Sequence, residues 1–546
     1  MILKPSCSAL LVVACCVFSL RASRGQSAPA AQGNFAINGT VVERDSNRPL
    51  NRVLVTIAPT ERRDVEVSYL TASDGRFAFT GLPAGKYSLG AQRRGELPQG
   101  YRQSDTFATA IAVGPGIDSG NIVFPLDVLA SISGTVLDQD GDPVRQAQLW
   151  LFRKGVFNGK LQVISRNTQQ SDSAGAFQFS HLRPGTYFVA VQARPWYAQN
   201  SPAPQVPEGE QGAAHSELDV AYPVTYYGDS TDAASAAPIV LPKGGAASLQ
   251  ITVRAVPAVH VVLAGTEPQA NQAFGATLFT AGPGGYSIPI GPMMSVINNR
   301  QELSGIAPGH YIVVLQSYDQ SHGEPFGRKS IDLTGNAILD THDLPATSIS
   351  GQLTFEGDSH PDTRPFIRFF ARSDDFNEGF MAEVGKDGSF NGNADVSPGH
   401  YEIQLANAPG WYVKSSAVRG GTGSGDQIDI PEGAAVQVSI VAAKGLIRMD
   451  GIALKDGKPF AGAMVLLLPE DLSRVADIRR DQSDSDGTFT LRDAVPGRYT
   501  LLAIDDGHDL AYQDPAVIKP YLSAGKILDL PAQLNAGVKA EVLTRR

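Results

Sequence analysis

The sequence has little cysteine, little charge and few long apolar runs. Its only cysteines are Cys7, Cys15 and Cys16, so a chain that loses its N-terminal segment has neither disulfides nor thiolate metal sites. Charged residues make up 18 % of the chain, and the formal net charge is −10. No basic run stands out. This argues against a nucleic-acid partner, because phosphate binding needs a concentrated Lys/Arg surface.

The most apolar stretch lies at the N-terminus. Lys4 precedes an almost wholly apolar segment at residues 8–20, and small residues follow near Gly25. This layout is typical of a secretory signal peptide cleaved near Gly25, and the run is too short to span a bilayer. Lipidation at Cys15 is the alternative, although the residues after Cys15 stay apolar. We therefore expect a secreted, periplasmic or outer-envelope protein with no transmembrane segment in the mature chain.

What the chain has in quantity is glycine and proline, with 56 and 36 residues respectively. Such a composition suits short strands joined by tight turns and disfavours long surface helices. The chain has 546 residues, more than one hydrophobic core usually serves, so several domains are expected.

A Pro-Gly-x-Tyr motif occurs four times along the chain, and the variant Pro83-Ala84-Gly85-Lys86-Tyr87 precedes them as a fifth copy, which implies a repeat architecture. The copies end in Tyr87, Tyr187, Tyr311, Tyr401 and Tyr499. Two further motifs precede most copies. An alternating opening strand carries a glycine, as in Ile132-Ser133-Gly134, and an Asp-Gly-x-Phe turn introduces another strand, as in Asp74-Gly75-Arg76-Phe77. About seven short strands per copy, with turns between them, predict an antiparallel sandwich.

The predicted fold class is all-β, a string of about five antiparallel Ig-like or transthyretin-like β-sandwiches after the signal peptide. The third copy is divergent, because it lacks the opening glycine and the Asp-Gly-x-Phe turn. A short helix is also expected around residues 472–478. The predicted limits are a signal peptide at 1–25, a flexible leader at 26–34, and sandwiches at 35–127, 128–256 (with an insertion at 194–242), 257–346, 347–443 and 444–546.

Taken together, these motifs resemble the carboxypeptidase regulatory-like domain, a transthyretin-like sandwich that occurs in tandem in bacterial surface proteins. The composition is similar to that of secreted repeat proteins of soil bacteria such as acidobacteria. The resemblance implies Ig-like sandwiches without catalytic groups of their own. Its fold is often classed as carbohydrate-binding-like, which is an analogy and not a property read from these residues.

The recurrent tyrosines and acidic turns have structural explanations. A Tyr that opens a strand after a Pro-Gly turn can bury its ring and bond its hydroxyl to nearby backbone. The Asp-Gly pairs are expected to be hairpin turns. Carboxylates cluster at Asp138-x-Asp140-Gly141-Asp142 and at Asp481 to Asp486. Calcium binding there is the alternative to a solvated turn, but neither cluster has EF-hand spacing.

The sequence gives little support for catalysis. No His-Glu-x-x-His pattern occurs among its nine histidines, so the zinc chemistry of peptidases is not encoded. His310 and His400 occupy the variable slot of Pro-Gly-x-Tyr and are expected to be exposed. Ser424 lacks the Gly-x-Ser-x-Gly context of a nucleophile elbow. We predict no enzymatic activity, no cofactor and no metal.

Aromatic residues in loops after the tyrosine strand are the best candidates for ligand binding. They could stack on sugar faces or anchor a protein, or instead fill the ends of the cores and the contacts between domains. The candidate residues are Trp196, Tyr197, Tyr226, Tyr227, Trp411 and Tyr412.

The resulting functional hypothesis is a non-enzymatic, adhesin-like binding or scaffold protein of the cell exterior or envelope. The expected partner is an extracellular or envelope protein or polysaccharide. Two alternatives stay open: a carbohydrate-binding protein that uses the loop aromatics, and an accessory subunit of a separately encoded hydrolase or transporter.

Overall fold

The computed structural model describes residues 33–545, except 95, 97, 105, 200–216, 265–272, 298–299, 319–326, 341–346, 372–378, 393–395, 397 and 532–536. The predicted signal peptide and the lipidation alternative at Cys15 lie outside these residues. Within the described part the chain is β-sheet with one α-helix, which confirms the all-β fold class. Five groups of strands form sandwiches, and each sandwich encloses a hydrophobic core. In the first four the facing sheets are separate, whereas in the fifth the last strand pairs with both layers and joins them into one eight-stranded sheet.

The strands of the first sandwich are β1 (Phe35–Glu43), β2 (Leu54–Pro59), β3 (Val67–Leu70), β4 (Arg76–Leu82), β5 (Gly85–Gln92), β6 (Gln99–Gly100), β7 (Ile111–Val113) and β8 (Ile122–Leu126). Those of the second are β9 (Ala130–Leu137), β10 (Gln148–Phe157), β11 (Lys160–Gln170), β12 (Ala176–Leu182), β13 (Gly185–Gln192), β14 (Val220–Ala221), β15 (Thr225–Tyr226), β16 (Ile239–Leu241) and β17 (Ala246–Thr252), with a 3-10 turn η1 (Ala233–Ser235). Strand β18 (Val256–Pro257) leads into the third sandwich, which has β19 (Val259–Ala264), β20 (Ala273–Ala281), η2 (Pro283–Gly285), β21 (Ser287–Ile290), β22 (Met293–Ile297), β23 (Arg300–Ile306), β24 (Gly309–Tyr318), β25 (Gly327–Leu333) and β26 (Ala337–Asp340).

The fourth sandwich has β27 (Ser348–Phe355), β28 (Phe366–Ala371), β29 (Phe380–Glu383), β30 (Ser389–Asn391), β31 (Gly399–Ala406), β32 (Trp411–Arg419), β33 (Thr422–Ser424), β34 (Gln427–Ile430) and β35 (Ala435–Lys444). The fifth has β36 (Ile447–Lys455), β37 (Lys458–Pro459), β38 (Met464–Pro469), η4 (Val475–Asp477), β39 (Arg479–Gln482), β40 (Thr488–Ala494), β41 (Gly497–Asp505), α1 (Pro515–Leu522), β42 (Lys526–Leu530) and β43 (Val538–Thr544).

One pairing pattern is common to all five sandwiches. The opening strand lies between two partners: it runs antiparallel to the strand that follows the Asp-Gly turn, or its counterpart in the third copy, and parallel to the last strand of the unit. This parallel pair is an addition to the expected antiparallel sheets. It joins the beginning of each repeat to its end, so a unit is complete only when both of its termini are in place.

The glycine of the opening strand is required by this close packing. A Cβ added to Gly134 would lie 2.4 Å from the carbonyl oxygen of Leu249 on the last strand and 2.8 Å from the ring of Phe177. Real Cβ atoms are not found so close to backbone, so only glycine fits without a shift. The equivalent residues Gly39, Gly351 and Gly451 are equally confined.

The divergent third sandwich makes the same packing with a different pair. Val261 takes the place of the opening glycine and Leu303 faces it from the neighbouring strand. Both residues are fully buried. A medium-sized side chain on each strand replaces the combination of a glycine and a phenylalanine, which conserves core volume approximately. The third copy therefore keeps the sandwich although it lost both sequence motifs.

The recurrent tyrosines form the predicted corners. Each ring is buried, and four hydroxyls donate to the carbonyl oxygen four residues earlier. These bonds are Tyr87 to Pro83 (3.0 Å), Tyr187 to Arg183 (2.7 Å), Tyr311 to Ala307 (2.7 Å) and Tyr499 to Val495 (2.8 Å). The prediction that these residues build the fold is thus confirmed at those four positions.

Two local features differ from the sequence expectations. The short helix of a turn or two expected around residues 472–478 is present as a single 3-10 turn, η4, but the α-helix α1 was not expected; it is the only α-helix in the described part. In the predicted insertion at 194–242, β15 and β16 both pair with β13. The later part of that insertion is therefore an ordered portion of the second sandwich.

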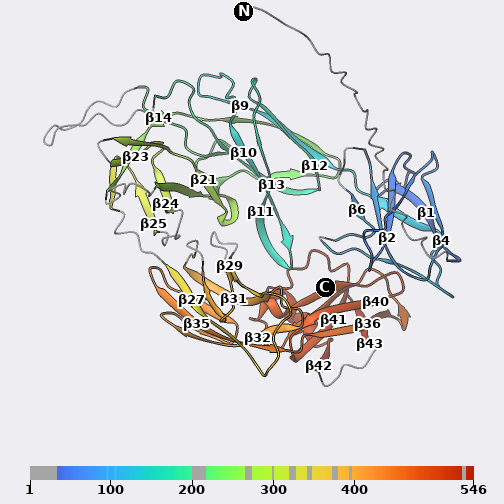
Figure 1. Ribbon diagram of the computed structural model, residues 1–546. Coiled ribbons are helices and arrows are strands. Elements are labelled where there is room, and N and C mark those ends of the chain that lie inside the picture. The colour runs from blue at the N-terminus through green and yellow to red at the C-terminus, as the bar shows by residue number, and fades with distance from the viewer. Residues whose placement is uncertain are drawn as a thin grey trace, which may run out of the picture.

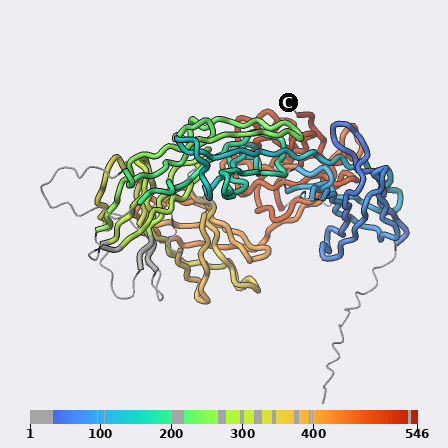
Figure 2. Tube along the Cα trace, turned by 90° about the horizontal axis from the view of Figure 1, so that it is seen from above, coloured from blue at the N-terminus to red at the C-terminus, as the bar shows by residue number. Residues whose placement is uncertain are grey.

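The five sandwiches do not form an extended rod. Figure 1 shows the chain turning back so that the fifth sandwich, in red, lies beside the first, in blue. The long hairpin β10–β11 of the second sandwich also reaches the fifth, where the backbone N–H of Gln513 donates to the carbonyl of Gly159 at 2.9 Å. The view from above in Figure 2 shows the same proximity of the second and fifth sandwiches. We call this the closed arrangement.

The confined glycine yields a prediction. Gly134→Ala should destabilise the second sandwich by about 2 kcal/mol, because the added methyl group overlaps a carbonyl that cannot move without breaking the β9–β17 pairing. Hydrogen exchange of the full chain should then show faster exchange in β9 and β17. Ser133→Ala, one residue earlier on the same strand, is the control and should leave exchange nearly unchanged. Equal protection in both variants would contradict the packing explanation.

Candidate functional site

The six candidate aromatic residues fall into three separate places. Trp196 and Tyr197 lie in the loop after β13, where the Trp196 side chain is 80 % exposed. Their ring centroids are 5.7 Å apart, with the planes nearly perpendicular. An exposed indole supported by a second ring is a suitable surface for stacking on an apolar face of a ligand. This is the place at which a candidate tryptophan is open to solvent.

The second pair packs between domains. Tyr226 is almost fully buried, and its hydroxyl donates to the carbonyl of Ala281 in the third sandwich at 2.6 Å. Burial raises the pKa of Tyr226. Tyr227 is half-buried against the core of the second sandwich. The buried Tyr226 ring has no free face for a ligand, so at this residue the structure favours the interdomain alternative.

The third pair lines a cleft of about 620 Å³ between the fourth and fifth sandwiches. Trp411 is only 3 % exposed because it opens β32 and packs edge-on against Phe355, with centroids 4.9 Å apart. Tyr412 is half-buried beside it. Volumes of this size at domain boundaries are typical of ligand sites. The Trp411 indole thus contributes a wall, and Tyr412 is the more accessible of the two rings.

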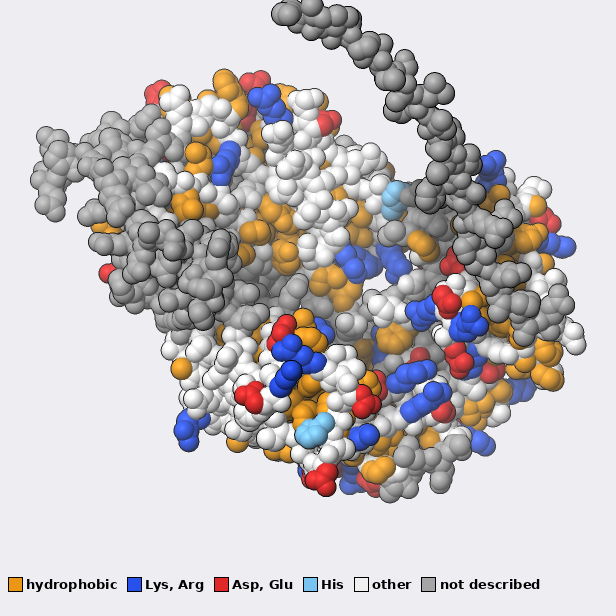
Figure 3. All heavy atoms as spheres, in the orientation of Figure 1, with side chains coloured by type: hydrophobic (Ala, Val, Ile, Leu, Met, Phe, Trp, Pro, Cys, Tyr) orange, Lys and Arg blue, Asp and Glu red, His pale blue; other side chains and the backbone are white. Residues whose placement is uncertain are grey.

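Charged groups form the floor of this cleft. The guanidinium of Arg474 in the fifth sandwich pairs with Asp426 of the fourth at 3.4 Å and with Asp477 of its own sandwich at 2.7 Å. Glu402 of the fourth accepts the backbone N–H of Ala476 at 3.2 Å. Burial raises the pKa of Asp477, and the positive charge of Arg474 opposes this rise. These contacts attach the fourth sandwich to the fifth, and Figure 3 shows acidic and basic side chains interspersed over this face of the molecule.

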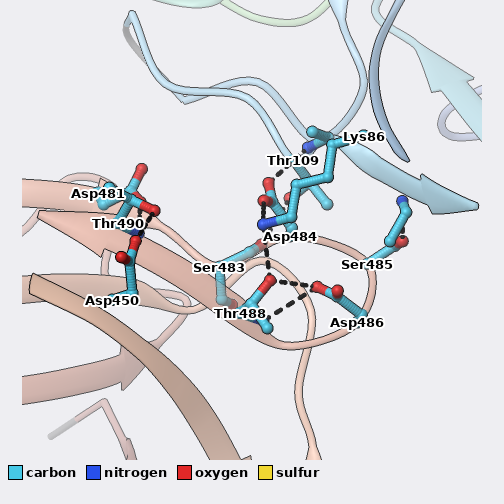
Figure 4. Close-up of polar contacts among 12 residues, drawn as sticks. Lys86, Thr109, Asp450, Asp481, Ser483, Asp484, Ser485, Asp486, Thr488 and Thr490 are labelled. Atoms are coloured by element: carbon cyan, nitrogen blue, oxygen red, sulfur yellow. Dashed lines mark hydrogen bonds and ion pairs between the residues drawn. The ribbon is translucent and has the colours of Figure 1, made fainter. Parts of the chain in front are cut away.

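A second polar junction joins the fifth sandwich to the first (Figure 4). Asp484 uses both carboxylate oxygens across it: Oδ2 accepts from the Lys86 ammonium at 2.5 Å, and Oδ1 accepts the backbone N–H of Ala110 at 3.0 Å. Lys86 also donates to the Thr488 hydroxyl at 2.7 Å. Burial raises the pKa of Asp484, an effect that Lys86 opposes. A single carboxylate therefore binds a side chain and a strand edge of the other domain.

Neighbouring groups extend this junction along the edge strand β7 of the first sandwich. The backbone N–H of Ser485 donates to the carbonyl of Ala110 at 2.9 Å, and its hydroxyl accepts the N–H of Ala112 at 2.8 Å. The side-chain amide of Gln482 donates to the Thr109 hydroxyl at 2.8 Å. The turn between β39 and β40 thus pairs with β7 almost as a further strand would. The fifth sandwich therefore docks on the first through this turn, which also serves as the hairpin turn between its own strands.

In the two acidic turns for which calcium binding was the alternative, the carboxylates accept hydrogen bonds from backbone and side-chain groups of the protein. Asp138 Oδ1 accepts the N–H groups of Asp140 and Asp142, each at 2.9 Å. In the second cluster, Asp484 is engaged with Lys86 as described. Among the described residues, no group of three or more His, Cys, Asp or Glu side chains is arranged to hold a metal ion.

His310 and His400 are exposed, as their positions predicted. Each contacts an aspartate on the neighbouring strand, His310 with Asp332 at 2.7 Å and His400 with Asp429 at 3.1 Å. Each pair lies within a single sandwich, the third for His310 and the fourth for His400, and both pairs face solvent. The side chain of Ser424 lies outside the described residues.

A comparison with known protein families supports the repeat architecture. The carboxypeptidase regulatory-like domain family matches residues 36–114 and 131–219. These two segments are carboxypeptidase regulatory-like domains. They correspond to most of the first and second sandwiches, so two copies of that domain type occur in tandem in the chain. A comparison with curated proteins finds no match.

Among solved structures, the chain is similar to a streptococcal ancillary pilin at 13 % identity, covering 52 % of this chain and 98 % of the pilin with a TM-score of 0.20. It is also similar to two B repeat units of the collagen-binding protein of Staphylococcus aureus, at 11 % identity over 70 % of this chain and 94 % of that one, with a TM-score of 0.15. Scores of this size do not establish a shared domain arrangement. In the part of the chain that is described, no helix has the length and apolarity to cross a membrane.

The Lys86–Asp484 contact predicts how the closed arrangement is held. Lys86→Met should leave Asp484 buried without its cation and weaken docking of the first sandwich on the fifth by about 1–2 kcal/mol, a reduced value because Lys86 is partly exposed. Small-angle scattering should then show a larger radius of gyration. Lys455→Met is the matched control, because the Lys455–Asp505 pair at 2.8 Å lies within the fifth sandwich. Identical scattering of parent and Lys86→Met would contradict this role.

Asp481, close to the same junction, predicts a pH effect. Burial raises its pKa from 3.8 to about 6, and its carboxylate accepts the N–H of Thr490 at 2.7 Å. The raised pKa means that the ionised form is unfavourable in the folded state. Lowering the pH from 7.5 to 5 should therefore stabilise the fifth sandwich by about 1.4 kcal/mol on this residue's account.

The test compares the parent with Asp481→Asn by hydrogen exchange of β39 and β40 at the two pH values. The variant keeps an acceptor for Thr490 but has no charge to bury, so its protection should vary less with pH than that of the parent. Parallel pH profiles in the two proteins would refute the assignment.

Proposed function

We propose that the protein is a non-enzymatic binding and scaffold protein of the cell exterior or envelope, adhesin-like in its use of repeated β-sandwiches. The observation that supports this most is the docking of the fifth sandwich on the first. Specific side chains hold domains far apart in sequence in one arrangement, with Asp484 bound to both Lys86 and Ala110. A fixed arrangement of surfaces serves a protein that presents loops to a partner.

The partner in this proposal is an extracellular or envelope protein or polysaccharide. The cleft between the fourth and fifth sandwiches offers such a partner a concave surface with Tyr412 on its wall and Arg492 among its lining residues. The family match supports the proposal, because it places two regulatory-like modules in a chain built almost wholly of sandwiches.

This proposal is tested with labelled full-length chain and isolated cell-envelope material. We expect saturable binding that is destroyed either by protease treatment or by periodate oxidation of that material, which separates a protein partner from a polysaccharide. Absence of saturable binding, or catalytic turnover of a component by the chain alone, would contradict it.

A carbohydrate-binding role is the second candidate, and the exposure of Trp196 favours it. An indole that is 80 % exposed costs hydrophobic free energy unless a ligand covers it. Tyr197 packs nearly perpendicular to the indole, and most of the Trp196 surface is left to solvent or to a ligand.

If Trp196 binds a sugar, Trp196→Ala should weaken retention on the polysaccharide that binds the parent by about fivefold or more, since aromatic stacking contributes about 1 kcal/mol beyond burial. Affinity electrophoresis on a polysaccharide panel measures this. Tyr69→Ala is the control, because Tyr69 is an exposed ring on the edge strand β3 of another sandwich. Equal retention of the two variants would remove Trp196 as the site.

A further inference from the structure

A buried histidine connects the second and third sandwiches. His260 lies on β19 and is only 3 % exposed. Its Nδ1 lies 2.6 Å from Oε1 of Glu302 on β23, and its Nε2 lies 2.8 Å from Oδ2 of Asp219, in the second sandwich just before β14. Both ring nitrogens thus face a carboxylate oxygen, and the Asp219 contact crosses the boundary between two domains.

The position of His260 explains why the third copy makes this contact. In the other copies the residue before the opening glycine points away from the core and is small and polar, as in Asn38 and Ser133. In the third copy the second sandwich covers that position through β14, which pairs with β18. The backbone N–H of Ala258 also donates to the carbonyl of Asp219 at 2.9 Å. The side chain at this slot is therefore enclosed between two domains.

The geometry sets the protonation that the bridge needs. An ionised carboxylate only accepts hydrogen bonds, and a neutral imidazole has one donor and one acceptor nitrogen. Two ionised partners therefore require an imidazolium that donates from both nitrogens. With a neutral ring, one nitrogen lone pair would face a carboxylate and that contact would become repulsive. Asp219 and Glu302 are the charged groups that contact the ring, while Asn336 accepts the backbone N–H of His260 at 2.9 Å and does not titrate.

The burial of Asp219 makes loss of the second proton of His260 unfavourable in free energy. Oδ1 of Asp219 is buried with no hydrogen-bond partner among the described residues. Among the described residues, the His260 ring is thus the hydrogen-bond partner of this side chain. If the ring stops donating, the carboxylate of Asp219 is left largely buried without compensation, which is strongly unfavourable. Other contacts of this boundary include the Tyr226 hydroxyl with the carbonyl of Ala281 and the Arg194 guanidinium with the carbonyl of Gly291, and neither involves a carboxylate or an imidazole.

We propose that His260 is a protonation-dependent bridge that holds the second sandwich against the third while its ring donates from both nitrogens, and that releases Asp219 as the pH rises. Histidine changes charge between about pH 5 and 8 in ordinary surroundings. The bridge is complete while the ring is protonated and both carboxylates are ionised, and its contribution is lost when the ring gives up its second proton. Packing of the second sandwich against the third is thereby coupled to the pH of the cell exterior.

The experiment is hydrogen exchange of the full chain between pH 6 and 8.5, corrected for the intrinsic pH dependence of exchange. For the parent we expect protection of β14 and β19 to fall with rising pH by up to about tenfold per unit, the limit for release of one proton. Asp219→Asn should abolish this fall, because an amide can donate to an unprotonated ring nitrogen and needs no second proton. Glu302→Gln tests the other nitrogen and should reduce the fall in the same way.

Two matched controls separate this bridge from general histidine titration. His310→Asn and His400→Asn remove exposed pairs with Asp332 and Asp429, and both variants should keep the parent profile at β14 and β19. Protection at these strands that is independent of pH in the parent would overturn the proposal. So would an unchanged pH profile in both Asp219→Asn and Glu302→Gln. None of these outcomes depends on the identity of a ligand.

Discussion

The close approach of three strands at the opening glycine is the constraint on which the whole molecule depends. The first strand of each repeat must fit between the last strand and the strand that carries the core phenylalanine, and at Gly134 the space left is smaller than a methyl group. Because the last strand pairs in parallel with the first, each repeat closes on itself. The third copy shows that the constraint concerns volume and not residue identity, since Val261 opposite Leu303 satisfies it as well.

With the cores built alike, the specific chemistry of the chain lies at the contacts between sandwiches. Asp172 of the second copy and Asp484 of the fifth occupy the same place in their turns. Asp172 accepts the N–H groups of its own turn, whereas Asp484 accepts from Lys86 and Ala110 of the first sandwich. Buried ion pairs contribute little net stability compared with apolar packing, but an unmatched partner is strongly penalised. Such contacts select one arrangement of domains over others, and this selection gives the chain its closed form.

The sequence was sufficient for the features that depend on local chemistry. Turn glycines, alternating strands and the tyrosine after each Pro-Gly are determined within a few residues, so the all-β repeat and its corners were predictable. Helix α1 was missed although Asp514 caps it and Pro515 occupies its first turn, a signal that sequence could have supplied. The features that the sequence left open were those decided by neighbouring domains and strands. Trp196 and Trp411 follow their tyrosines at similar distances, yet one begins a strand against Phe355 and the other ends in solvent.

This division follows from which face of a strand a residue occupies. Inward positions are shared by all copies, because the core tolerates only volume-conserving exchange. Outward positions carry no such limit, so a copy can place a histidine, a lysine or an aspartate there without disturbing its own fold. Whether that residue becomes a contact then depends on the domain that covers it, as the second sandwich covers His260. Sequence alone specifies five similar units. The arrangement of those units requires knowing which outward residues meet, and this information resides in pairs of positions that lie as far apart as Lys86 and Asp484.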